Sequence, residues 1–248
     1  MSAFRLDGEV VLLTGATGGL GQAMARELAA AGARLALAHL DDHERASELA
    51  ASLAATEVLT VAADLTDPDQ VDALFDQVEA RFGGCTVLVN NAGMMEESAF
   101  AEMSVEHWNR TLEADLTAPM LMCRRFVRGA DGRGRIVNVS SQLAFKGARN
   151  FVSYTAAKAG VVGLTRALAR EVGPGVRVNA IAPGPVITPL IADLADDPQW
   201  VAERTSGAVT GNVATPEEVA PIVVFLAAEA SALLHGQVLH ANGGGVMF

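Results

Sequence analysis

The chain has 248 residues, of which half are hydrophobic and 19% are charged. This length and composition suit one folded α/β domain with a large buried core and argue against disorder. The formal net charge of −11 offers no basic field to a phosphate backbone, so we expect no nucleic-acid partner.

The N-terminal stretch has charges on both sides of a very short apolar run. It therefore resembles neither a signal peptide nor a membrane anchor, and we expect a cytoplasmic protein with no membrane partner. Cys85 and Cys123 are too far apart for a local metal motif and too few for a disulfide framework. We expect both to be core residues, and we expect no metal site.

Short apolar runs alternate with helical patterns along the chain. The runs expected to form strands are 9–14, 35–38, 58–63, 86–89, 136–139, 176–181 and 238–240. Helices are expected at about 20–31, 43–54, 68–81 (capped by Asp67), 104–128 and 154–172, with a further capped start at 215–218.

Strands that are apolar throughout and alternate with helices predict a parallel sheet covered on both faces. This is the doubly wound, Rossmann-like α/β arrangement, in a single domain spanning residues 1–248. The proline-rich and acidic stretch at about 189–211 is expected to be irregular and to form a substrate lid.

The first expected strand runs into a glycine-rich turn, with Gly15, Gly19 and Gly21 in a G-x-x-x-G-x-G spacing. Glycines let the backbone turn sharply and approach a pyrophosphate, while the helix N-terminus offers free N–H groups and positive potential. We expect a dinucleotide site here. The alternative is an ordinary glycine-rich turn between a strand and a helix.

Two further loops follow expected strands and would meet at the same edge of the sheet. Asp64 either accepts a hydrogen bond from an adenine amino group or caps a helix. The run Asn90-Asn91-Ala92-Gly93 would let the chain pass close to the adenosine ribose and tie adjacent strands together, with Asn90 in a structural role.

Tyr154 and Lys158 are four residues apart at the start of an expected helix, so they share one face. A phenol can donate a proton to a reduced carbonyl, and a neighbouring ammonium favours its phenolate form. Ser141 ends an expected strand, where its hydroxyl would polarise a carbonyl oxygen. The alternative is a surface Tyr–Lys pair and a serine that caps a strand.

The chain resembles the short-chain dehydrogenase/reductase family essentially from end to end. The matching motifs are T-G-A-T-G-G-L-G at 14–21, D-L at 64–65, N-N-A-G at 90–93, S-S at 140–141, Y-T-A-A-K at 154–158 and P-G-P-V-I-T at 183–188. The resemblance implies an NAD(P)(H)-dependent oxidoreductase that interconverts a ketone and a secondary alcohol.

The resemblance also implies a role for each motif. Ser141 polarises the carbonyl, Tyr154 is the acid/base, and Lys158 binds the ribose and favours the phenolate. Thr188 and the backbone of Val186 hold the nicotinamide carboxamide. The residues expected to contact the cofactor are Gly15, Thr17, Gly18, Gly19, Leu20, Gly21, His39, Asp64, Leu65, Asn91, Ala92, Gly93, Tyr154, Lys158, Pro183, Gly184, Val186 and Thr188.

One residue departs from the family pattern at the expected catalytic centre. The family usually has an asparagine seven residues after a tryptophan, where it helps to hold a water chain to the lysine, but Trp108 is followed at that distance by Asp115. We expect Asp115 to join the catalytic set by pairing with Lys158, although its buried charge can alter the titration of the group. A dinucleotide-binding protein without turnover is therefore the alternative to an enzyme.

The C-terminal sequence is similar to that of the family's 3-oxoacyl-acyl-carrier-protein reductases, which makes a 3-oxoacyl thioester the first substrate expectation. Members that act on small alcohols, sugars or xenobiotic ketones have nearly the same ending and are the alternative. The side chains that either line a substrate pocket or serve only in packing are Met94, Met95, those of loop 142–151, Leu190, Ile191, Leu194 and Trp200. Arg149 either meets an anionic group or is solvated.

The resemblance further implies a homotetramer, in which the tyrosine-bearing helix pairs with its copy and subunits also pack around the C-terminal strand. The cofactor is expected to be NADP(H) by a modest margin. His39 stands where NAD-preferring relatives have an aspartate, and when protonated it would donate to a 2′-phosphate, so the preference would weaken as pH rises. Gly18 and Leu40 offer no charge there, and Asp41 opposes a phosphate.

Overall fold

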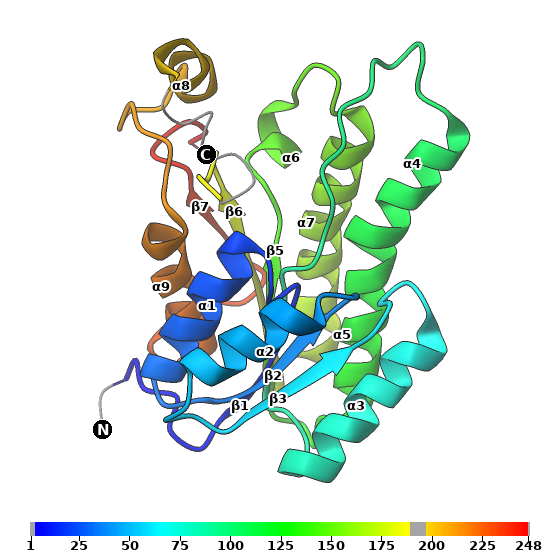
Figure 1. Ribbon diagram of the computed structural model, residues 1–248, viewed down its shortest axis with the longest axis vertical. Helices are drawn as coiled ribbons and strands as arrows, with labels where there is room; N and C mark the ends of the chain where they lie inside the picture. The colour runs from blue at the N-terminus through cyan, green and yellow to red at the C-terminus, as the bar shows by residue number, and fades with distance from the viewer. Residues whose placement is uncertain (1–2, 189–196, 248) are drawn as a thin grey trace.

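The computed structural model describes residues 3–188 and 197–247. Seven parallel strands form one sheet in the order β3-β2-β1-β4-β5-β6-β7, covered by helices on both faces (Figure 1). The strands are β1 Val10–Thr14, β2 Arg34–His39, β3 Val58–Ala62, β4 Val87–Asn90, β5 Gly134–Val139, β6 Val176–Pro183 and β7 Val238–Ala241. The predicted doubly wound parallel sheet is confirmed.

The helices mostly lie where the sequence predicts them. They are α1 Gly19–Ala30, α2 His43–Ser52, α3 Pro68–Phe82, α4 Val105–Leu112, η1 Glu113–Thr117, α5 Ala118–Gly129, α6 Leu143–Lys146, α7 Val152–Val172, α8 Pro198–Thr205, α9 Pro216–Ala227 and η3 Glu229–Ser231. Asp67 caps α3 by accepting from the Asp69 backbone N–H. Thr215 and Glu218 form a capping box at α9, as expected for helix starts of this composition.

The core has two parts because the strand side chains alternate between the faces of the sheet. From β1, Val11 and Leu13 pack with α1, α2 and α9, whereas Val10 and Leu12 pack with α3, α5 and α7. Both sets are buried, which explains why the strand reads as a continuous apolar run.

After β1, the strands β2 and β3 are added on one side of it, whereas β4 to β7 are added on its other side. The strand order therefore reverses between β1 and β4, which are neighbours in the sheet. Each is followed at its carboxyl end by one of the motif loops, 15–18 after β1 and 91–93 after β4. A crevice outside the carboxyl ends of strands at such a reversal is where ligands bind in open α/β sheets.

The structure corrects two sequence predictions. The single helix expected at 104–128 is α4 and α5 joined by η1, a π-helical turn, and a π-turn of this kind commonly marks a functional position. The stretch at 189–211 is not irregular throughout, because α8 lies within it. The lid residues Leu190, Ile191 and Leu194 lie outside the described residues.

Candidate functional site

The glycines of the first loop bring two chain segments too close for side chains. Gly15 has a φ of +61°, and a Cβ on it would lie 2.8 Å from the Ala92 Cα. A Cβ on Gly21 would lie 2.2 Å from the Gly15 carbonyl oxygen. These two positions therefore require glycine, and the first turn of α1 lies directly on the loop after β1.

The N-terminus of α1 has the features of an anion-binding site. Its N-cap is Gly18, and no side chain caps the helix. The first backbone N–H groups of a helix have no partner within the helix, and the helix dipole adds positive potential there. An anionic group such as a pyrophosphate would accept hydrogen bonds from these N–H groups and would be attracted by the positive potential.

Hydrogen bonds join the loop after β4 to the end of β1. The Asn91 side-chain amide donates to the backbone oxygens of Thr14 at 3.1 Å and Gly15 at 3.0 Å. Thr14 Oγ1 accepts from the Ala92 backbone N–H at 3.0 Å. Asn90 is buried and donates to Asn138 Oδ1 at 2.9 Å. The expected ties between neighbouring strands and the structural role of Asn90 are both present.

A cavity of about 700 Å³ lies over these loops. Most of the residues expected to bind a cofactor line it: Gly15, Thr17, Gly18, Gly19, Leu20, Gly21, His39, Asp64, Leu65, Asn91, Ala92, Gly93 and Thr188. The other expected contacts, Tyr154, Lys158, Pro183, Gly184 and Val186, are not among the lining residues. Gly184 and Val186 instead contact neighbouring strands and loops. Val186 bridges to Ala214, and the Gly184 backbone N–H donates to Ala241.

Asp64 does not cap α3, because Asp67 does. Its Oδ1 accepts hydrogen bonds from the backbone N–H of Thr66 at 2.9 Å and from the Thr66 hydroxyl at 2.7 Å. Of the two predicted roles, helix capping is therefore wrong, and Asp64 lies on the cavity wall.

His39 differs from the charged donor that the sequence predicts. It is 4% exposed, and its Nδ1 accepts from the Asp42 backbone N–H at 3.2 Å. Burial, together with the nearby His43, lowers the pKa of His39 below 6.5. At neutral pH the ring is therefore uncharged, with its proton on Nε2.

Tyr154 and Lys158 lie on consecutive turns of α7, with Lys158 Nζ 5.6 Å from the centre of the tyrosine ring. The Lys158 ammonium lies 2.9 Å from Asp115 Oδ1 and donates to the Val139 backbone oxygen at 3.3 Å. Asp115 Oδ2 accepts from the Met94 backbone N–H at 3.4 Å. The structure therefore brings Asp115, Tyr154 and Lys158 together.

Burial is the largest single effect on Lys158 and opposes its charge, but the attraction and hydrogen bond of Asp115 together with the attraction of Tyr154 outweigh it, so the pKa of Lys158 is raised. Burial also raises the pKa of Asp115, although the Lys158 ammonium opposes that shift. Lys158 is therefore an ammonium at neutral pH.

Ser141 follows β5 and is 8% exposed. Its Oγ accepts from the Leu143 backbone N–H at 3.1 Å, which leaves the hydroxyl hydrogen free to donate to a ligand. The preceding Ser140 donates to the Lys158 backbone oxygen at 2.9 Å. This bond places the loop that carries Ser141 beside the helix turn that carries Lys158.

Sequence reasoning missed part of the cavity wall. Thr66 also lines it, and so do four residues that flank Asp115 in the sequence: Arg110, Glu113, Ala114 and Ala118. Residues 110, 114 and 118 are spaced by four, so they share one helical face, and that spacing was a signal that sequence reasoning could have used.

Met94, expected near the substrate, lines the cavity; Met95 and Arg149 are exposed.

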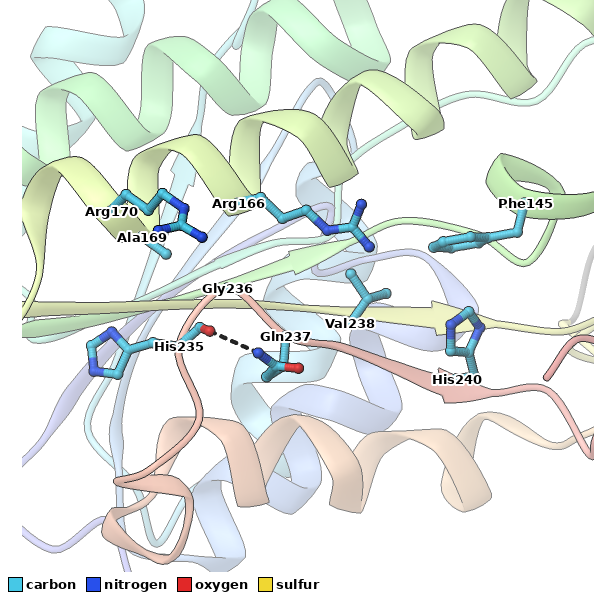
Figure 2. Close-up of a pocket in the computed structure, with 9 residues that line it drawn as sticks. All are labelled: Phe145, Arg166, Ala169, Arg170, His235, Gly236, Gln237, Val238 and His240. Atoms are coloured by element: carbon cyan, nitrogen blue, oxygen red, sulfur yellow. Dashed lines mark hydrogen bonds between the residues drawn. The ribbon is translucent and has the colours of Figure 1, made fainter. Parts of the chain in front are cut away.

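A second cavity, of about 830 Å³, lies between α7 and β7 at the edge of the sheet. Arg166 and Arg170 extend from α7 on one side of it, and His235 and His240 lie on the other (Figure 2). The His240 ring packs edge-on against Phe145 at 4.6 Å between centroids. Phe145, from the loop 142–151 expected near a substrate, lines this cavity, whereas the residues predicted for catalysis and cofactor binding do not.

Within residues 3–188 and 197–247, no helix combines the length and apolar character needed to cross a membrane. The same ranges hold no group of three or more His, Cys, Asp or Glu side chains placed to bind a metal ion.

Comparisons with known proteins agree with this geometry. A family model described as "Enoyl-(Acyl carrier protein) reductase" matches residues 15–245. The chain is 43% identical to a cis-4-hydroxycyclohexanecarboxylate dehydrogenase of Sinomonas cyclohexanicum, over 95% of each chain. It is 34% identical to a 3-oxoacyl-[acyl-carrier-protein] reductase of Aquifex aeolicus, over 97% of this chain and 98% of that one.

A solved structure is similar over nearly the whole chain. It is a putative NAD(P)-dependent gluconate 5-dehydrogenase from Beutenbergia cavernae with bound NADP at low occupancy. The TM-score is 0.90 at 40% identity, and the match covers 98% of this chain and 99% of that one.

Proposed function

Because the chain belongs to the short-chain dehydrogenase/reductase family, whose members are oxidoreductases of secondary alcohols and ketones, we propose that Ser141, Tyr154 and Lys158 are its catalytic residues. Asp115 is the fourth member and acts through Lys158. The observation that carries the proposal is the contact of Lys158 with both Asp115 and the Tyr154 ring. The whole chain acts as one catalytic unit, with about 189–211 as its substrate lid.

The residues at the crevice suit a nicotinamide dinucleotide. Gly15 and Gly21 keep the loop backbone close to the uncapped N-terminus of α1, which would hold the pyrophosphate. Asp64 and Leu65 would lie at the adenine, Asn91 to Gly93 at the adenosine ribose, and Thr188 with the Val186 backbone at the nicotinamide. When bound, the dinucleotide supplies or accepts a hydride.

The chain's own residues provide the proton. As the carbonyl carbon gains a hydride, the Tyr154 O–H bond breaks and its proton passes to the carbonyl oxygen, giving the alcohol and a phenolate. The Ser141 hydroxyl donates a hydrogen bond to the same oxygen and stabilises the charge that develops there. The Lys158 ammonium stabilises the phenolate. Alcohol oxidation is the same path in reverse.

The preferred substrate class is a small secondary alcohol or its ketone. The more similar relative, at 43% identity, is named for a hydroxycyclohexane carboxylate, which supports this class. A 3-oxoacyl thioester, the first expectation from the sequence, is the second candidate, and the relative at 34% identity supports it.

A panel assay tests the function and separates the two substrate classes. The absorbance of the reduced nicotinamide is followed with cyclic alcohols, polyols and their ketones, and with a 3-oxoacyl thioester, using Tyr154→Phe as the control. The proposal expects turnover of at least one small alcohol or ketone at a kcat/KM above that of the thioester. Dinucleotide binding without turnover across the panel would refute it and favour a binding protein.

The expected cofactor is NADP(H), by a small margin. A neutral His39 donates one hydrogen bond to the charged 2′-phosphate, which contributes about 1.5–3 kcal/mol and corresponds to a preference of about 10- to 100-fold before the opposing charge of Asp41 is counted. Asp41, whose side chain is 91% exposed, opposes a phosphate. The NADP bound in the Beutenbergia structure supports this choice.

The expected assembly is a homotetramer in the cytoplasm. Ala159, Gly163 and Ala167 are exposed at a spacing of four on α7, a small-residue face that permits close approach of a second helix. The strand β7 is an edge of the sheet, and the cavity beside it (Figure 2) offers a second surface for a copy to cover. Light scattering at micromolar concentration tests this, and a mass near one chain, 25.7 kDa, would refute it.

A further inference from the structure

The side chains of Asp115 and Lys158 form a buried ion pair. The side chains are 0% and 5% exposed, and the charged atoms are 2.9 Å apart. A Cβ on Gly93 would lie 2.2 Å from Asp115 Oδ1 and 3.1 Å from Lys158 Nζ. The loop after β4 therefore packs directly on the pair, and a side chain at Gly93 would displace it.

The groups that face the pair come from several elements. The titratable groups that act on Lys158 are Asp115 from η1 and Tyr154 from α7, and Val139 of β5 contributes a backbone oxygen. Asp115 is acted on by Lys158 and by the Met94 backbone N–H. Within this set, Asp115 supplies the negative charge nearest to the ammonium.

A lone buried ammonium would attract a phenolate strongly, because charges interact over longer distances where water is excluded. A carboxylate 2.9 Å from that ammonium carries the opposite charge and weakens its field at the neighbouring ring. An asparagine at position 115 would keep a hydrogen-bond acceptor there but would leave the ammonium charge uncancelled. The balance between phenol and phenolate at Tyr154 therefore depends on the charge at position 115.

We propose that Asp115 is a positioning residue that neutralises the Lys158 ammonium and so keeps Tyr154 as a proton-donating phenol at neutral pH. The enzyme then reduces ketones across the neutral range, whereas alcohol oxidation, which needs the phenolate, rises only at alkaline pH. The kinetic part of this inference rests on the proposed function, but the state of the phenol does not.

The ionisation of Tyr154 can be measured without any activity, because it is the only tyrosine in the chain. The ultraviolet absorbance of tyrosinate is titrated in the wild type and in Asp115→Asn, with Tyr154→Phe as the blank. Asp76→Asn is the matched control, since Asp76 is an ion-paired aspartate on the surface, 2.9 Å from Arg125. We expect Asp115→Asn to lower the midpoint by about one pH unit or more and Asp76→Asn to leave it unchanged.

Coinciding midpoints for the wild type and Asp115→Asn would overturn the inference. If circular dichroism shows that Asp115→Asn is unfolded, Asp115→Ser replaces it as the uncharged variant. The midpoint of the wild type alone is a further test. A wild-type midpoint below about pH 8, roughly two units under that of a free phenol, would overturn the inference.

The kinetic arm follows kcat/KM for alcohol oxidation against pH. The pH at the midpoint of the acid limb should be lower in Asp115→Asn, by the same amount as the tyrosinate midpoint. An acid limb at the same pH as in the wild type would contradict the role of Asp115. Dinucleotide binding without turnover in the wild type would refute the proposed function alone, because the absorbance titration still decides the role of Asp115.

Discussion

The Ser140 hydroxyl donates a 2.9 Å hydrogen bond to the Lys158 backbone oxygen, which joins the end of β5 to the turn of α7 that carries Lys158. Ser140 is 2% exposed, so an alanine there would leave the carbonyl without this donor. We expect Ser140→Ala to lower the free energy of unfolding by about 1–2 kcal/mol and to lower kcat, because Ser141 is held less firmly.

Urea unfolding, turnover and dinucleotide affinity measured on the same preparations test this expectation. Ser47→Ala is the control, since its hydroxyl donates at 2.8 Å to the His43 backbone oxygen at an exposed position. Dinucleotide affinity should stay within a few-fold of the wild type in both variants. A Ser140→Ala protein with wild-type stability and turnover would show that this bond does not support the site.

Gly18, the N-cap of α1, and Gly21, in its first turn, should respond differently to alanine. A Cβ on Gly21 would lie 2.2 Å from the Gly15 carbonyl oxygen, whereas the nearest atom to a Cβ on Gly18 is 3.5 Å away. We expect Gly21→Ala to weaken dinucleotide binding by tenfold or more, about 1.4 kcal/mol, and Gly18→Ala to change it by much less. Calorimetric titration of both variants measures this, and equal affinities would contradict the steric account.

The preference between the two dinucleotides should hardly depend on pH between about 7 and 8. The pKa of His39 is lowered below 6.5 by burial, so above that pH the ring has already lost its second proton and no further charge is removed. Protonation, and with it a stronger preference for NADP(H), is expected only as pH falls below about 6.5. The sequence predicts a preference that weakens as pH rises, and the burial of His39 confines that change to pH values below about 6.5.

The ratio of kcat/KM for the two cofactors, measured at several pH values, checks this point. His39→Ala should remove the small NADP(H) preference. A clear NAD(H) preference at every pH would indicate that Asp41 governs the ribose site instead.

Both cysteines should be inert in the folded protein. Burial raises the pKa of the Cys85 and Cys123 thiols to about 12, and the thiolate is the form that reacts. We expect negligible labelling by a thiol reagent in the native state and labelling of both after denaturation. Rapid native labelling with loss of activity would contradict this. Cys123 is buried as expected, whereas Cys85 is only partly buried.

The strands were predictable because a parallel sheet covered on both faces buries a strand such as β1 at every position, and its first four residues are apolar. The π-turn that carries Asp115 was not, because a shift of backbone hydrogen bonds by one residue leaves the apolar period almost unchanged. The uncharged state of His39 depends on tertiary burial and on the Asp42 backbone N–H. The hydrogen bonds that Asp64 accepts from Thr66 were not predictable either. Both Asp64 and Asp67 precede α3, and their positions in the sequence do not show which of them caps the helix.

The proposed mechanism requires Tyr154 to supply the proton, and Tyr154→Phe isolates this role, because phenylalanine keeps the ring and removes only the hydroxyl. We expect turnover at saturating cofactor to fall by about 100-fold or more, with dinucleotide affinity within a few-fold of the wild type. Lys158→Ala, by contrast, should reduce both. Equal turnover in the wild type and Tyr154→Phe at saturating cofactor would contradict the proposed mechanism.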